Sequence, residues 1–232
     1  MTSDDCIRVK TQATCTLVNF LRALFSKEDG IETEFVDMLK PYSKKLLEVI
    51  TEVFEFSIKV NYFPLQEESL NALSLLASIL DEEFAEFYPN IMPGLKKFLY
   101  NLQPVTIQEC ELKAKAIETI SELCSSVASK PEQFLDDFKE LAEAFGKIFS
   151  TLKEDDVQVK AVLDAFVHIS TGMKDLFLPY LKELFPLFEK YLLADIDFQV
   201  EDGSLNEFRD KENNKKNNMT MKDVNIKLNF LG

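Results

Sequence analysis

Residues that could carry acid, base or nucleophilic chemistry are few in this 232-residue chain, and they are widely separated. The one histidine, His168, has no plausible catalytic partner, because a nucleophilic triad needs a base held against Ser or Cys. The four cysteines (Cys6, Cys15, Cys110 and Cys124) form no CxxC pair, and we interpret them as buried, reduced thiols. A redox or zinc site is therefore not expected.

Paired carboxylates and glycines also fail to define a reaction centre. Asp136 and Asp137, like Asp155 and Asp156, lie at predicted helix starts, where the helix dipole favours negative charge. All six glycines are isolated, so the chain has no phosphate-binding loop. We predict that the chain is not an enzyme and that it has neither a catalytic residue, a metal site nor a cofactor.

A row of carboxylates is the best candidate for a binding surface. Five apolar residues at helical spacing predict one buried face: Phe134, Phe138, Leu141, Phe145 and Phe149. The opposite face then presents Asp136, Glu140 and Glu143 at i, i+4 and i+7, beside Asp137. Such a row would attract an extended Lys/Arg-rich peptide, although a solvated helix face is the alternative interpretation. Glu86 and Asn90 occupy the comparable face of the preceding hairpin, and Lys182 and Glu183 that of the following one.

The elements that position these residues recur every 46 or 47 residues. Three segments that begin at Asn71, Glu118 and Asp164 share one apolar phase. Their inward residues are Leu70, Leu73 and Leu76; Ile117, Ile120 and Leu123; and Leu163, Phe166 and Ile169. Each is followed by a second, Phe-rich helix. This pattern predicts an all-α superhelix of about four helical hairpins that cover residues 5–61, 66–102, 109–152 and 155–194. In such a stack we expect the second helices to line the concave, partner-binding face.

Prolines and the last 38 residues need separate interpretation. Pro41, Pro93 and Pro186 recur in register, either as kinks inside the second helices or as the starts of those helices. We predict that Pro64 closes the first unit and that Gly172 marks the turn of the fourth. Residues 195–232 are interpreted as a non-helical linker or disordered tail, in which residues 224–230 alternate as a short strand would. Because no capping helix follows the repeats, we expect a fragment of a longer protein.

Charge and hydropathy limit the partners. The net charge is -14, with 40 acidic against 26 basic side chains, which disfavours direct nucleic-acid binding and favours basic protein partners. Acidity that only maintains solubility is the alternative. No apolar run approaches the roughly 20 residues that span a bilayer, so we expect no membrane insertion and an intracellular, soluble chain.

Three stretches carry a resemblance to a known family. They are QEESLNALSLLASILDEEFAEFYPNIMPGLKKFL at 66–99, LKAKAIETISELCSSVASKPEQF at 112–134, and LPYLKELFP at 178–186 after the acidic triplet at 154–156. These stretches resemble the HEAT repeats of the importin-beta superfamily, most closely the importin beta-3 (karyopherin beta-3) type, over residues 8–194. The resemblance implies a karyopherin that shuttles between cytoplasm and nucleus and releases its cargo when Ran-GTP binds.

The same resemblance implies the partners. They are basic nuclear localisation signals or cargo proteins, nuclear pore Phe-Gly proteins, and the Ran GTPase, which family members bind mainly through repeats that this chain does not include. Asp136, Glu140, Glu143, Glu86 and Asn90 are then the candidate cargo-binding residues, by position. The alternative is a HEAT-repeat scaffold of another class, such as a phosphatase regulatory subunit.

Overall fold

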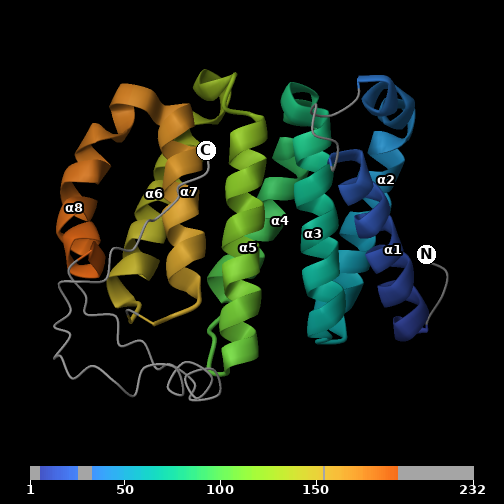
Figure 1. Cartoon of the computed structure of the whole chain (residues 1–232), viewed down its shortest axis with the longest axis horizontal. Helices are drawn as coiled ribbons and strands as arrows, with labels where there is room; N and C mark the ends of the chain where they lie inside the picture. Colours follow the sequence, from blue (N-terminus) through green and yellow to red (C-terminus); the bar gives the residue numbers. More distant parts are fainter. Residues whose placement is uncertain (1–5, 26–32, 154, 193–232) are drawn as a thin grey trace, which may run out of the picture. The chain divides into compact units, whose positions relative to one another are not determined.

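A computed structural model describes residues 6–25, 33–153 and 155–192, which all lie in the unit Met1–Ala194. Four first helices pack side by side in chain order, each on the next, and Figure 1 shows them as the nearer layer with α4 and α6 behind. They are α1 (Ile7–Phe25), α3 (Phe63–Leu80), α5 (Ile107–Ser126) and α7 (Gln158–Met173). The second helices are α2 (Thr33–Lys59), α4 (Tyr88–Asn101), α6 (Pro131–Thr151) and α8 (Leu178–Leu192). The predicted all-α stack of helical hairpins is confirmed, whereas the exact division into hairpins and tail stays a prediction.

The predicted apolar stripes form the core. Leu73, Ile120 and Phe166, the central residue of each stripe, are all buried. Burying a side chain of this size contributes roughly 1.5 to 3 kcal/mol, and each does so only against the neighbouring helices. Leu163 is the exception, because it is only half-buried. It lies on α7, which has no further first helix against its other side in the described part of the chain.

Local sequence explains where several helices begin. Thr106 and Glu109 form a capping box at the start of α5, in which each side chain accepts a hydrogen bond from the other residue's backbone N–H. Pro131 occupies the first turn of α6, where a missing N–H costs nothing. Pro64 does the same for α3. The prediction that Pro64 closes the first unit was therefore wrong, because this proline starts the next helix.

Two turns within hairpins share one backbone conformation. Asp81, after α3, has φ 46° and ψ -127°, and Lys174, after α7, has φ 50° and ψ -128°. Each is the first residue of a short 3₁₀ helix, η1 (Asp81–Glu86) or η2 (Lys174–Phe177). The turn of the fourth hairpin is therefore at Lys174, and the prediction that Gly172 marks it was wrong. Gly172 lies inside α7, where a Cβ would approach the Phe138 ring to 2.5 Å, so glycine is required for close packing.

The recurrent prolines lie inside helices. Pro41, Pro93 and Pro186 fall within α2, α4 and α8, each of which begins more than one turn earlier. The interpretation in which each second helix starts at its proline was therefore wrong. The predictions that concern residues 195–232, including a strand at 224–230, lie outside the described residues.

Cysteines are less uniform than predicted. Cys124 is buried, whereas Cys15 and Cys110 are partly exposed and Cys6 is exposed. The prediction of buried thiols is therefore right only for Cys124. None of the four forms a disulfide in the described part of the chain.

Candidate functional site

The second helices form one wall of the stack, and an aromatic pair joins each two neighbours in it. Phe54 of α2 contacts Phe98 of α4 with ring centroids 5.0 Å apart, and Tyr88 of α4 lies 4.6 Å from Phe134 of α6. Phe149 of α6 stacks on Tyr191 of α8 at 4.8 Å. We call α2, α4, α6 and α8 together the second-helix wall. These apolar contacts fix the helices whose polar faces carry the candidate binding residues.

Helix α6 has the two faces that the sequence predicts. Its five stripe residues are all buried. The spacing that buries them leaves Asp136 and Glu143 exposed on the helix. The acidic face is therefore real, and the question is whether its carboxylates are available to a partner.

Lys96 of α4 occupies the middle of the acidic row. Its Nζ donates to Asp137 Oδ1 at 2.7 Å and also to Glu140 Oε2. The hydroxyl of Tyr100, one turn further along α4, donates to Glu140 Oε1 at 2.8 Å. The Lys96 side chain is only 14% exposed, against 33% for Asp137 and 48% for Glu140. We call these four residues, Lys96, Tyr100, Asp137 and Glu140, the α4–α6 clamp.

The clamp shifts the ionisation of its members. Burial lowers the pKa of Lys96, but its hydrogen bonds to Asp137 and Glu140 outweigh burial and raise the pKa above 10.5. The hydrogen bond from Lys96 holds the pKa of Glu140 below 4.5, against the opposing effect of burial. Burial and the hydrogen bond to Glu140 both raise the pKa of Tyr100. At neutral pH the clamp therefore holds a lysinium, an ionised Glu140 and a neutral phenol.

The candidate residues outside the clamp remain accessible. Asp136 is fully exposed and has Lys139 3.9 Å away, too far for a strong pair. Glu143 is exposed on the same helix and pairs with no cation among the described residues. Glu86 lies exposed at the end of η1, and Asn90 is exposed near the start of α4. The structure thus places Asp136, Glu140 and Glu143 together on α6 and leaves Glu86 and Asn90 on the neighbouring hairpin.

Open grooves lie between successive second helices. Between α2 and α4 a groove of about 320 Å³ is lined by Asn90, Phe87 and residues of α2. Between α4 and α6 a groove of about 400 Å³ includes Tyr100, Glu140 and Glu143. Between α6 and α8 the groove is about 750 Å³ and again includes Glu143. Glu143 is therefore the carboxylate of the row that borders two grooves.

Sequence reasoning missed Lys96, Tyr100 and Tyr88. Tyr88 is buried beneath the wall, with its hydroxyl 3.8 Å from the Cys124 thiol, and burial raises the pKa of both groups, that of Cys124 to about 12. It anchors α4 on α5 and α6. Tyr88, Lys96 and Tyr100 are spaced by multiples of four, so one face of α4 could have been identified from the sequence.

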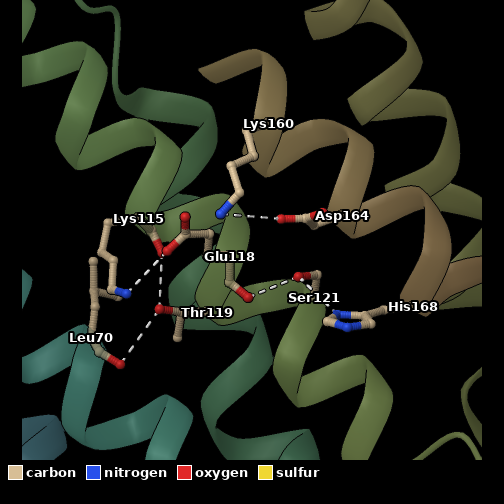
Figure 2. Close-up of polar contacts among 8 residues, drawn as sticks. All are labelled: Leu70, Lys115, Glu118, Thr119, Ser121, Lys160, Asp164 and His168. Carbon is tan, nitrogen blue, oxygen red and sulfur yellow. Dashed lines mark hydrogen bonds and ion pairs between the residues drawn. The ribbon is translucent and has the colours of Figure 1, made fainter. Parts of the chain in front are cut away.

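His168 has a structural setting rather than a catalytic one. Figure 2 shows its Nδ1 facing the Ser121 hydroxyl across the α5–α7 contact, at 3.3 Å. The Ser121 hydroxyl donates to the Glu118 carbonyl at 2.8 Å, so its proton is already engaged. Asp164, one turn before His168, pairs with Lys160. This side of α5 also reaches α3, because Thr119 contacts the Leu70 carbonyl.

The described residues form neither a metal site nor a membrane-spanning helix. Within residues 6–25, 33–153 and 155–192, no group of three or more His, Cys, Asp or Glu side chains converges as metal ligands would. Of the helices that the structure describes, none combines the length and the apolarity that crossing a membrane requires.

A stack of helical hairpins with one grooved wall defines the class of helical-repeat binding proteins. Comparison with known protein families identifies one of them: the family model for importin subunit beta-1-like TPR repeats matches residues 30–200 of this chain. The chain therefore belongs to the importin-beta family. Its members are transport receptors and not enzymes.

Two curated relatives support this assignment. The chain is 30% identical over 184 residues to a probable importin-5 homolog of Dictyostelium discoideum, a match that covers 78% of this chain and 16% of that protein. It is 27% identical over 158 residues to a probable importin subunit beta-4 of Schizosaccharomyces pombe, which covers 68% of this chain and 13% of the relative. The chain thus spans less than a fifth of the length of the curated relatives it matches.

Proposed function

We propose that this chain contributes part of the cargo-binding wall of a nuclear import receptor, and that α6 binds basic nuclear localisation signals or basic cargo proteins. The observation that carries the proposal is the pair of accessible carboxylates Asp136 and Glu143 on either side of Glu140. An i, i+7 pair spans two helical turns, about 10 Å, which suits two basic side chains of one extended peptide.

The clamp modifies this role for Glu140. Lys96 already neutralises part of the acidic row, so a partner cation gains less from Glu140 than from its neighbours. Glu86 and Asn90 extend the surface towards α4 and supply a carboxylate and an amide. Asp136 and Glu143 therefore contribute most of the electrostatic attraction, while Glu140 mainly holds the wall together.

The wider cycle follows from the family. In the full-length protein we propose shuttling between cytoplasm and nucleus, contacts with nuclear pore Phe-Gly proteins, and cargo release when Ran-GTP binds. Ran contacts are assigned mainly to repeats outside this chain. The importin beta-3 type is the proposed branch, and it is supported by the identity shared with a probable importin-5 homolog.

Fluorescence anisotropy with a labelled Lys/Arg-rich import-signal peptide tests this proposal. Reversing both charges in Asp136→Lys/Glu143→Lys should weaken binding about 5- to 30-fold, since each exposed pair contributes roughly 0.2 to 1 kcal/mol and reversal adds repulsion. Binding by the unmodified chain should also weaken as salt rises.

The control is Glu111→Lys/Asp164→Lys, which changes the net charge equally at exposed positions on the first helices α5 and α7, outside the row. If both double variants weakened peptide binding equally, the effect would come from overall charge, and the proposed surface would be refuted. Absence of binding by the unmodified chain would refute it outright.

A further inference from the structure

Of the three grooves described above, the one between α6 and α8 has the largest volume. Its floor is apolar, with Ala142 and Gly146 on α6 facing Leu184 and Leu187 on α8. Glu143 and Glu183 stand at its sides, next to Tyr180. At about 750 Å³ the groove is nearly twice the size of the α4–α6 groove, and the difference needs a structural reason.

Burial patterns align the second helices and supply that reason. In α4 the buried residues Tyr88, Met92, Leu95 and Leu99 match Phe134, Phe138, Leu141 and Phe145 of α6, each 46 residues further on. The same step takes Phe138 to the buried Leu184 of α8. The register therefore holds across three successive second helices.

In this register the α4–α6 clamp has no counterpart between α6 and α8. Lys96 corresponds to Ala142, Tyr100 corresponds to Gly146, and Asp137 corresponds to Glu183. One carboxylate of the clamp is thus retained as Glu183, whereas Glu140 corresponds to Pro186, and the Lys96 and Tyr100 side chains are reduced to a methyl group and a hydrogen. The groove is the volume that a Lys and a Tyr would otherwise fill.

The two carboxylates of the groove, Glu143 and Glu183, have no ion-pair partner in the described part of the chain. Neither Glu143 nor Glu183 forms an ion pair with any residue that the structure describes. Both carboxylates lie near Tyr180. Burial is the larger cause that raises the pKa of the Tyr180 phenol, and the negative charges of Glu143 and Glu183 raise it further. Two carboxylates beside an apolar hollow match a ligand with one cation and one adjacent bulky group.

We propose that the α6–α8 groove binds a helical segment of a partner protein that carries one Lys or Arg and, one turn further on, an aromatic side chain. The cation takes the position of Lys96 and pairs with Glu183 and Glu143. The ring takes the position of Tyr100 and packs over Ala142 and Gly146 against the two leucines of α8. The inference rests on the proposed partner-binding role of the second-helix wall, but it assigns a different ligand to the α6–α8 groove, which shares Glu143 with the proposed import-signal surface.

The rim explains why this ligand differs from a basic import signal. Lys139 and Lys147 also line the groove, so its ionic side chains balance, with two of each sign. A run of basic residues would bring like charges together, whereas a single cation flanked by apolar or acidic residues would not. The groove therefore selects a single basic residue with an aromatic neighbour.

A designed probe tests the proposal on the full chain. The probe is a fluorescein-labelled, alanine-based helical peptide with one Lys and, four residues later, one Tyr. Replacing its Lys by Gln, or its Tyr by Ala, should each weaken binding about fivefold or more, since both contacts are needed. Glu183→Gln in the protein should remove the difference between the Lys and Gln peptides, and Glu132→Gln on the same wall should not.

A double substitution that fills the groove, called here the filling variant, provides a second test. Ala142→Lys/Gly146→Tyr places the α4 pair into α6, and a Cβ at Gly146 would meet Leu184 at 3.7 Å, an ordinary contact. This variant should raise the melting temperature and lose probe binding at least tenfold. It leaves Asp136, Glu140 and Glu143 unchanged, so binding of the basic import-signal peptide should persist, which separates failure of this proposal from failure of the proposed function.

Three results would overturn the proposal. The probe could bind no more tightly than its two control peptides, or it could bind the filling variant as well as the unmodified chain. Alternatively, the filling variant could abolish self-association of the chain in sedimentation, which would assign the groove to a second copy instead of a partner.

Discussion

Replacing Lys96 with Met removes the cation of the α4–α6 clamp while it keeps most of the apolar stem. Two carboxylates, Asp137 and Glu140, then face each other without a counter-charge, and the Tyr100 hydrogen bond alone remains. We expect the variant to fold but to be less stable, because each hairpin is held only by its neighbours.

The magnitude follows from burial. A hydrogen bond to a charged group contributes about 1.5 to 3 kcal/mol when buried, and an exposed ion pair about 0.2 to 1 kcal/mol. Lys96 is nearly buried, but its partners are a third and a half exposed, so the loss for both bonds together is about 1 to 3 kcal/mol. For a chain of this length that corresponds to a fall in Tm of roughly 2 to 10 °C.

The pH dependence has a defined sign. Glu140 has a lowered pKa in the folded chain, so its contribution to stability is present above pH 4.5 and is lost as pH falls through the lowered value. Lys96 has a raised pKa, so its contribution is present below pH 10.5 and is lost as pH rises through the raised value. The difference in free energy of unfolding between the unmodified chain and the Lys96→Met variant should therefore be constant from about pH 6 to 9 and shrink below about pH 4.

Thermal melts followed by circular dichroism measure this difference, with Lys97→Met as the matched control. Lys97 is exposed on the same helix and forms no ion pair with any described residue, so its variant should melt within about 1 °C of the unmodified chain. In a chain that already carries Asp137→Asn and Glu140→Gln, adding Lys96→Met should lower the stability only slightly further, because the two charged partners of Lys96 are already gone. Equal effects of the two lysine variants, or a full additional cost in that background, would refute the clamp.

Two further predictions concern packing. Ile120→Ala removes a fully buried side chain from the central helix α5 and should cost about 2 to 5 kcal/mol, seen as a lower urea midpoint; an unchanged midpoint would contradict its role in the core. Gly172→Ala should destabilise the chain by about 1 to 3 kcal/mol, because its Cβ meets Phe138. A Cβ at Gly94 would meet no atom within 4 Å, so Gly94→Ala should instead stabilise α4 by about 0.5 to 1 kcal/mol. If Gly172→Ala and Gly94→Ala shifted Tm in the same direction, the close packing at Gly172 would be contradicted.

Much of the fold could be predicted because hydrophobic periodicity reports burial directly. The stripes around Leu73, Ile120 and Phe166 needed no knowledge of partner helices, since spacing alone identifies the inward face. Turns were harder, because a proline can start a helix as readily as end one, as Pro64 shows. The start of α5 was placed two residues late, although the Thr106 and Glu109 spacing of a capping box was visible.

The candidate site was only partly predictable, because periodicity says which face a residue occupies and not which side chain lies opposite it. Asp136, Glu140 and Glu143 were correctly grouped on one face of α6. Lys96 lies more than 40 positions away in the chain, and only the packing of α4 beside α6 brings it between Asp137 and Glu140. An unbroken acidic row in the sequence is therefore interrupted by a basic side chain in the folded protein.

The matching turns at Asp81 and Lys174 separate the architecture of the repeat from the charge that it displays. Both residues adopt nearly the same left-handed backbone conformation, yet one is an acid and the other a base. Since neither is glycine, both of these hairpins retain a side chain at this corner, and the two side chains differ in the sign of their charge while the backbone conformation is nearly the same. At these two turns the charge displayed on the surface is therefore independent of the backbone geometry that joins the helices.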